Sequence, residues 1–287
     1  MIRIVELGPR DGLQNEAIAI PATAKVAFVD ALSRTGVPEI EVSAFVSRRR
    51  IPQLADAEAV FERIARAPGV VYSALVPNEV GLDRALASRV GKIAVFTAAS
   101  ETFNRKNINA GIAESMDRFA PVVERTREIG LPVRGYISTA FWCPYEGKID
   151  PARVIAVAQQ LLDLGVDELS IGDTIGRAVP DEVIAVLERL LEKAPAARLA
   201  MHFHDTFGHA IENVIASWRL GVETFDSSAG GIGGCPFAPG ATGNVATEAV
   251  IRALRGLGAP VDVDLEALGA ARQVIASALG RDLDPAS

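Results

Sequence analysis

Cysteine is scarce in this chain of 287 residues, where it occurs only at Cys143 and Cys235. The two positions are far apart, and neither belongs to a Cys-x-x-Cys pair. This scarcity excludes a disulfide framework and a zinc ribbon, and it favours a reducing compartment. We therefore expect a cytoplasmic protein.

Basic charge is also in deficit, because 29 Lys and Arg residues stand against 36 Asp and Glu residues, for a net charge of −7. Without a dominant basic face, general binding to nucleic acid is not expected. No apolar run approaches the roughly 20 residues that a membrane-spanning helix needs, so no membrane association is expected. The first predicted strand begins at Ile2, which leaves no room for a signal peptide.

Short apolar runs alternate with longer amphipathic runs along the whole chain, a pattern typical of buried strands and surface helices. The predicted strands are 2–7, 39–43, 70–76, 92–96, 132–138, 168–171, 198–202 and 224–227. The predicted helices are 23–34, 55–66, 80–89, 112–129, 151–164, 180–193, 210–220 and 245–254. This strict alternation predicts an α/β fold, a (β/α)₈ TIM barrel that forms a single catalytic domain over residues 1–287. An extra C-terminal helix is expected at 264–279, and its apolar character suggests a homodimer. A doubly wound open sheet is the alternative fold.

The active site of such a barrel lies at the carboxyl ends of its strands. Polar or glycine-rich stretches follow the predicted strands at 8–16, 47–50, 100–107, 172–176 and 230–244. Glu41 lies within the second strand, and the seventh strand ends in histidines. These stretches should therefore meet at one rim.

The run His202-Phe203-His204 contains two of the three histidines of the chain. Side chains alternate in an extended strand, so both imidazoles point to the same face. Two neutral imidazoles at the carboxyl end of a strand indicate a metal site. A hydrogen-bonded pair of core histidines is the alternative.

Two imidazoles need oxygen ligands to hold a divalent cation. Asp11, in a tight loop between glycines, is the candidate carboxylate, and Asn244 could add an amide oxygen. This set of donors suits Mg²⁺ or Mn²⁺ and could also hold Zn²⁺. In the alternative interpretation Asp11 forms a loop turn and Asn244 caps the next helix.

Two further residues are candidates for the chemistry. Arg10, beside the proposed ligand Asp11, could stabilise an oxyanion or enolate, or it could form a salt bridge to Glu41 or Glu6. Asp173 lies in a Gly-Asp-Thr-Ile-Gly turn. It could act as general base or acid, or it could make only an Asx turn.

The two cysteines differ in their surroundings. Cys235 lies in a glycine-rich stretch at 230–243, and such a loop could bring its thiol over a substrate. A buried, inert thiol is the alternative. Cys143 precedes Pro144 without such a context, and we expect it to be structural. The arginines at 48–50 could recruit a phosphate-bearing ligand, or they could form a solvated run.

Several motifs together resemble the 3-hydroxy-3-methylglutaryl-CoA lyase family. They are GPRDGLQNE at 8–16, KNIN at 106–109, CPYEGKI at 143–149, GDTIG at 172–176, HFHDTFG at 202–208 and GGCPFAPGATGN at 233–244. The resemblance covers nearly the whole chain. It implies a metal-dependent TIM-barrel lyase that acts on an acyl-CoA substrate.

The resemblance also implies roles for individual residues. The implied metal ligands are Asp11, His202, His204 and Asn244, for Mg²⁺ or Mn²⁺. The implied catalytic residues are Arg10, Glu41, Asp173 and Cys235, and the implied substrate-binding residues are Arg10, Gln14 and Asn107. The implied reaction is a retro-Claisen cleavage of 3-hydroxy-3-methylglutaryl-CoA into acetyl-CoA and acetoacetate.

Three positions depart from the family pattern: Ala44 replaces a usual serine, Arg50 a common aromatic residue and Trp142 a frequent glycine. These departures leave open another 3-hydroxy-acyl-CoA, such as a longer-branched or citramalyl thioester. Claisen synthases of the isopropylmalate type and retro-aldolases of the 4-hydroxy-2-oxovalerate type share some motifs but lack the Gly-Gly-Cys-Pro stretch. A metal-binding barrel without activity is a further alternative.

Overall fold

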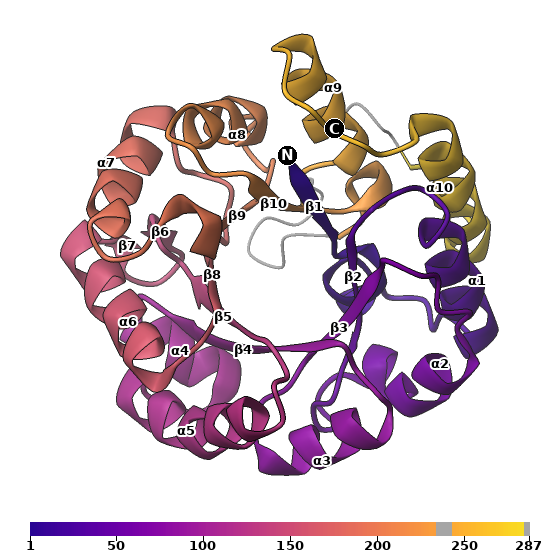
Figure 1. Cartoon of the computed structure of the whole chain (residues 1–287), viewed down its shortest axis with the longest axis horizontal. Helices are drawn as coiled ribbons and strands as arrows, with labels where there is room; N and C mark the ends of the chain where they lie inside the picture. The colour runs from indigo at the N-terminus through magenta and orange to yellow at the C-terminus, as the bar shows by residue number, and fades with distance from the viewer. Residues whose placement is uncertain (234–242, 284–287) are drawn as a thin grey trace.

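The computed structural model describes residues 1–233 and 243–283. Eight parallel strands close into a barrel in the order β1-β10-β9-β8-β5-β4-β3-β2, surrounded by helices (Figure 1). The strands are β1 Arg3–Glu6, β2 Glu39–Ala44, β3 Val71–Leu75, β4 Lys92–Ala98, β5 Val133–Ser138, β8 Glu168–Asp173, β9 Leu199–Phe203 and β10 Thr224–Ser227. Because β1 pairs with both β10 and β2, the ring is closed. The predicted barrel is confirmed, and the open sheet is excluded.

The helices form the outer layer of the barrel. They are α1 Ala22–Leu32, α2 Ala57–Arg63, α3 Glu79–Ala87, α4 Glu101–Ile108, α5 Ile112–Glu128, α6 Pro151–Leu164, α7 Pro180–Leu191, α8 Ala210–Arg219, α9 Thr247–Gly256 and α10 Leu265–Leu279. None of the helices in residues 1–233 and 243–283 is long and apolar enough to cross a membrane.

The extra C-terminal helix is present as α10. It begins after Asp264, whose carboxylate accepts hydrogen bonds from the backbone N–H groups of Glu266 and Ala267, an N-cap that satisfies two otherwise free donors. The helix packs beside α1 (Figure 1). Its apolar side chains Leu268 and Ile275 are buried within the chain, so they provide no support for a homodimer.

A short helix and a small hairpin near the barrel mouth were not expected from the sequence. The short helix α4 occupies part of the polar stretch after β4, because the hydroxyl of Ser100 accepts the backbone N–H of Phe103 and caps it. A small antiparallel hairpin of β6 (Trp142–Cys143) and β7 (Gly147–Lys148) follows β5. Both elements lie after the carboxyl ends of strands, where they help to shape the barrel mouth.

The interior of the barrel is partly charged. At the amino ends of the strands, Lys92 Nζ donates to Glu39 at 3.0 Å and to Glu168 at 3.3 Å, and Arg134 Nε donates to Glu168. These side chains are buried, and a buried charge without a partner would cost several kcal/mol. Acidic and basic side chains are therefore paired in this part of the interior.

A separate apolar cluster lies against the strands β2 to β5 and contains Ala44, Leu54, Leu75, Ala94 and Tyr136.

Candidate active site

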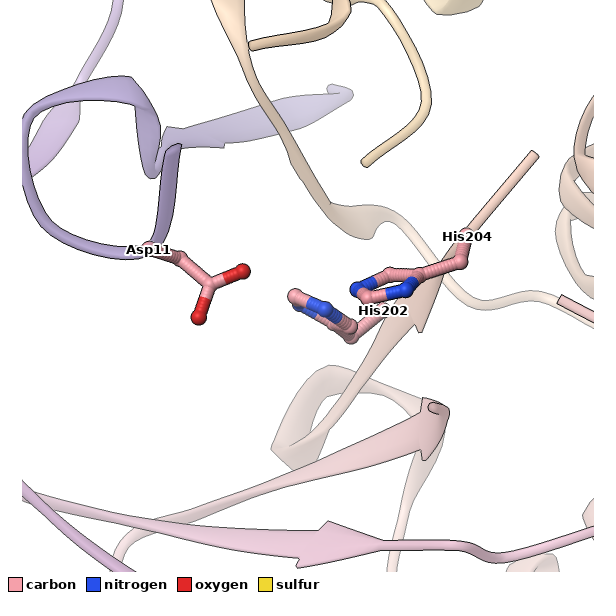
Figure 2. A group of neighbouring side chains, drawn as sticks. All are labelled: Asp11, His202 and His204. Atoms are coloured by element: carbon pink, nitrogen blue, oxygen red, sulfur yellow. The ribbon is translucent and has the colours of Figure 1, made fainter. Parts of the chain in front are cut away.

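Three predicted metal ligands meet at the carboxyl ends of the strands. His202 belongs to β9, His204 follows it, and Asp11 lies in the short helix η1 (Gly8–Gly12) after β1. One ligand atom of each residue lies within 4.8 Å of the others. Figure 2 shows the Asp11 carboxylate directed towards the two imidazole rings. The alternation of β9 therefore places both histidines on the interior face, as predicted.

The electrostatics of this cluster suit a cation. Burial alone would raise the pKa of Asp11, but the positive charge of Arg10, together with His202 and His204, holds it well below its usual range. Burial and the neighbouring His202 lower the pKa of His204 to about 4. A carboxylate beside a neutral imidazole is the protonation state that metal binding requires.

The histidines also have unsatisfied polar atoms. Within the described part of the chain, Nδ1 of His202 and Nδ1 of His204 are buried without a hydrogen-bond partner. This disagrees with the alternative of a hydrogen-bonded histidine pair. Since buried polar groups are normally satisfied, the unpartnered Nδ1 of His204 fits a site that holds a divalent cation, whereas Nδ1 of His202 faces Asp226 Oδ2 at 3.4 Å.

Asn244 joins this cluster through both its backbone and its side chain. It forms an antiparallel bridge with His204, and its Nδ2 donates to Asp11 Oδ2 at 3.0 Å and to the carbonyl of Ile232 at 3.1 Å. The alternative role as a helix cap is wrong, because α9 begins at Thr247 and its N-cap residue is Ala246. Asn244 thus lies where its amide can reach the proposed metal site.

Arg10 is fixed from two sides. Its Nε donates to Glu41, and its Nη1 donates to Asp11 Oδ1 at 2.5 Å. Burial would lower the pKa of Arg10, but these two carboxylates raise it. The salt bridge to Glu41 is therefore present, whereas Glu6 accepts hydrogen bonds from other groups.

Tyr136 completes the arrangement around Glu41 and was missed in the sequence. Its hydroxyl donates to Glu41 Oε2 at 2.9 Å, and the guanidinium of Arg10 lies 5.6 Å from the ring centroid. The predicted strand 132–138 already contained this residue, and alternation places it on the same face as Arg134 and Ser138. Which face is interior depends on the closed barrel.

Asp226 was also missed, although it lies in a predicted strand. It occupies β10 beside His202, with its Oδ2 3.4 Å from Nδ1 of that histidine. Burial would raise the pKa of Asp226, but Arg134 and His202 lower it to about 2. The residue is therefore a carboxylate directly behind one of the proposed metal ligands.

Asp173 lies at the end of β8, with only 1% of its surface exposed. Its two carboxylate oxygens accept the backbone N–H groups of Arg177 at 3.2 Å and Ala178 at 2.9 Å. Burial raises its pKa to about 6, against the lowering effect of these two hydrogen bonds. The two accepted N–H groups lie four and five residues on, so these bonds are not those of the Asx turn that was the alternative. The pKa suits proton transfer near neutral pH.

A cavity of about 750 Å³ opens beside the group formed by Asp11, His202 and His204. Gln14 and Asn107, the implied substrate-binding residues, both line it, as do Asp11, His202, His204 and Arg10. The wall formed by β3 and β4 is apolar and includes Leu75 and Phe96. Arg50 and Arg118 line the same cavity. The cavity therefore has a polar end, which contains the candidate metal ligands, and an apolar wall.

The two cysteines have different outcomes. Cys235 lies outside the described residues, so its role stays a prediction. Cys143 is buried in β6, and its Sγ donates to the hydroxyl of Ser100 at 3.0 Å while accepting the backbone N–H of Tyr145 at 3.4 Å. These contacts connect the β6–β7 hairpin with the start of α4 and agree with the structural role expected for Cys143.

Comparison with known proteins agrees with this geometry. A profile of the HMGL-like family matches residues 1–275. Over 280 residues, the chain is 48% identical to the 3-hydroxy-3-isohexenylglutaryl-CoA/hydroxy-methylglutaryl-CoA lyase of Pseudomonas aeruginosa, with 98% of this chain and 93% of that protein covered.

Two solved structures extend the comparison. The HMG-CoA lyase of Brucella melitensis has a TM-score of 0.95 and 47% identity, covering 96% of this chain and 98% of that one. An HMG-CoA lyase of Acinetobacter baumannii in complex with coenzyme A and 3-methylmalate has a TM-score of 0.94 and 35% identity, covering 99% and 93%. Barrel, site geometry, family profile and relatives agree, and the chain belongs to the HMGL-like family.

Proposed function

We propose that the protein is a metal-dependent carbon–carbon lyase that cleaves 3-hydroxy-3-methylglutaryl-CoA into acetyl-CoA and acetoacetate. The observation that carries the proposal is the meeting of Asp11, His202 and His204 beside Arg10 in one cavity. The names of the relatives support this substrate, and the coenzyme A complex of the Acinetobacter enzyme supports an acyl-CoA partner.

The proposed metal site consists of Asp11, His202, His204 and Asn244, and we propose Mg²⁺ or Mn²⁺ as its occupant. Carboxylate, amide and imidazole donors suit either cation. When bound, the cation supplies Lewis-acid polarisation of the C3 hydroxyl and of a carboxylate oxygen of the substrate, which eases loss of the hydroxyl proton.

The protein residues have separate roles in the proposed cleavage. Asp173 accepts the C3 hydroxyl proton, after its carboxylate turns from the loop amides towards the cavity. As the C2–C3 bond breaks, C3 becomes the ketone of acetoacetate and C2 becomes the enolate of acetyl-CoA. Arg10 stabilises the enolate oxygen, while Glu41 orients Arg10. Cys235 then donates a proton to C2 of the enolate, which becomes the methyl group of acetyl-CoA.

Substrate binding is proposed for Gln14 and Asn107, with Arg10 as a third contact, because all three line the cavity. The cytoplasmic location and the homodimer stay predictions. They would be checked by cell fractionation and by light scattering of the purified protein.

The direct test is acetyl-CoA release from 3-hydroxy-3-methylglutaryl-CoA by the purified protein, before and after chelation. We expect activity with Mg²⁺ or Mn²⁺, its loss with chelator and its return when either cation is added back. A panel of thioesters with longer C3 branches identifies the preferred acyl group. Metal binding without turnover of any thioester would overturn the proposal and favour a barrel without activity.

A further inference from the structure

Asp226 and His202 are neighbours across two paired strands inside the barrel. In the parallel register of β9 and β10, Asp226 lies opposite His202, so the two side chains face the interior at the same level. Asp226 Oδ2 lies 3.4 Å from Nδ1 of His202. In the described part of the chain, this nitrogen has no other polar partner. Asp226 is therefore the carboxylate that lies next to Nδ1 of the imidazole ring of His202.

The carboxylate of Asp226 is itself held in place. Arg134 Nη1 donates to Oδ1 at 2.6 Å, and the hydroxyl of Ser170 donates to Oδ2 at 2.7 Å. Arg134 is in turn held by Glu168 and by the hydroxyl of Tyr136, the latter at 3.1 Å. Because all of these groups are buried, the carboxylate has little freedom to rotate away from the histidine.

We propose that Asp226 is a positioning residue that sets the orientation and tautomer of His202 for metal binding. The carboxylate attracts the proton of His202 to Nδ1, which leaves the lone pair of Nε2 for the cation. Carboxylate partners of this kind hold the ring of a metal-binding histidine and increase its basicity. The inference rests on the proposed metal site and extends it to a residue that makes no contact with the cation.

A purely structural role for Asp226 makes a different prediction. The carboxylate would then serve only to neutralise Arg134, and its loss would lower stability without changing the affinity of the folded protein for a metal. Affinity for Mn²⁺, measured without substrate by electron paramagnetic resonance at a temperature where every variant is folded, separates the two roles.

The test compares four variants with the wild-type chain. D226N removes the charge at nearly constant volume, and S170A removes the hydrogen bond that fixes Oδ2. E39Q is the matched control, because Glu39 is another buried carboxylate of the same interior network that pairs with Lys92 and contacts neither histidine. H202A shows whether the measured Mn²⁺ occupies the proposed site.

We expect D226N to raise the dissociation constant for Mn²⁺ by about 10- to 100-fold and S170A to raise it less. E39Q should lower the unfolding temperature and leave the dissociation constant within about twofold. If H202A binds Mn²⁺ like the wild type, the proposed metal site is wrong and the inference is overturned with it.

If H202A loses binding while D226N and S170A keep wild-type affinity, the metal site stands and the inference alone is overturned. The same conclusion follows if E39Q weakens binding as much as D226N does. S170A decides the question if D226N does not fold, because unchanged affinity in S170A would then overturn the inference.

Discussion

Asn244 donates a hydrogen bond from Nδ2 to Oδ2 of Asp11 at 3.0 Å, although the two residues lie 233 positions apart in the chain. The contact joins the loop after β1 to the segment before α9, and both segments border His204. The amide therefore lies against a carboxylate that, in the proposed function, also binds the cation.

Loss of the Asp11 side chain should weaken metal binding more than loss of the Asn244 side chain. Asp11→Asn removes the anionic ligand, so we expect the dissociation constant for Mn²⁺ to rise at least about 100-fold, and Asn244→Ala should raise it about 10-fold. Asp205→Asn is the control, because the Asp205 carboxylate accepts the N–H of Ala210 at the start of α8, and the variant should bind Mn²⁺ normally. Wild-type affinity in Asp11→Asn would contradict the proposed site.

Replacement of Arg10 should affect catalysis more than metal binding. Lysine keeps the charge but carries its donors on a single nitrogen, so it cannot reach Glu41 and Asp11 from two separate nitrogens of a planar fork, as the guanidinium of Arg10 does. We expect Arg10→Lys to lower kcat by about 100- to 1,000-fold with little change in Mn²⁺ affinity. Steady-state kinetics and metal titration on the same preparation check this, and a normal kcat would remove Arg10 from the proposed mechanism.

Glu6 provides a prediction about stability and pH. Burial raises its pKa from 4.5 to about 7, against the lowering effect of hydrogen bonds from Ala229, Thr247 and Gly8. The native state therefore holds the proton more tightly than the unfolded state does. The contribution of Glu6 to stability is complete below pH 4.5 and is lost as the pH rises to about 7, at a cost of up to about 3 kcal/mol.

Glu6→Gln should remove this loss. The amide oxygen can accept the N–H groups of Gly8 and Ala229, and the amide nitrogen can donate to Thr247, whose hydroxyl can accept as well as donate. We expect the variant to gain stability relative to the wild type as the pH rises from 5 to 8. Urea unfolding of both proteins at several pH values measures the difference, and parallel curves would contradict it.

The sequence was sufficient for the barrel and for the histidine pair, because both follow from local periodicity. Alternating runs predicted the strands, and the spacing of His202 and His204 placed both rings on one face. The C-terminal helix was equally local, since Asp264 caps it within three residues. Strands and helices have side-chain periods of two residues and 3.6 residues, so they can be predicted without knowledge of the fold.

The interior contacts could not be predicted in the same way. The pairing of Asp226 with His202 depends on the register between β9 and β10, which the sequence of either strand does not contain. The hydrogen bond from Tyr136 to Glu41 crosses the closed barrel from β5 to β2. Asn244 illustrates the same limit, because a local motif suggested a helix cap, whereas a bridge to His204 fixes its position.

Asp173 provides the last prediction, since its proposed role as base requires a deprotonated carboxylate. Its pKa is raised to about 6 by burial, so kcat/KM should rise as the pH increases through about 6 and then level off. Asp173→Asn should lower kcat by about 100- to 10,000-fold and remove this rise, without a change in Mn²⁺ affinity.

Thr174→Val is the control, because it removes the hydroxyl that accepts the N–H of Thr139 and loosens the same loop while the carboxylate remains. The control should keep the rise near pH 6 even if its rate falls. If both variants keep the rise, Asp173 only shapes the loop, and the base must be sought among the groups that line the cavity.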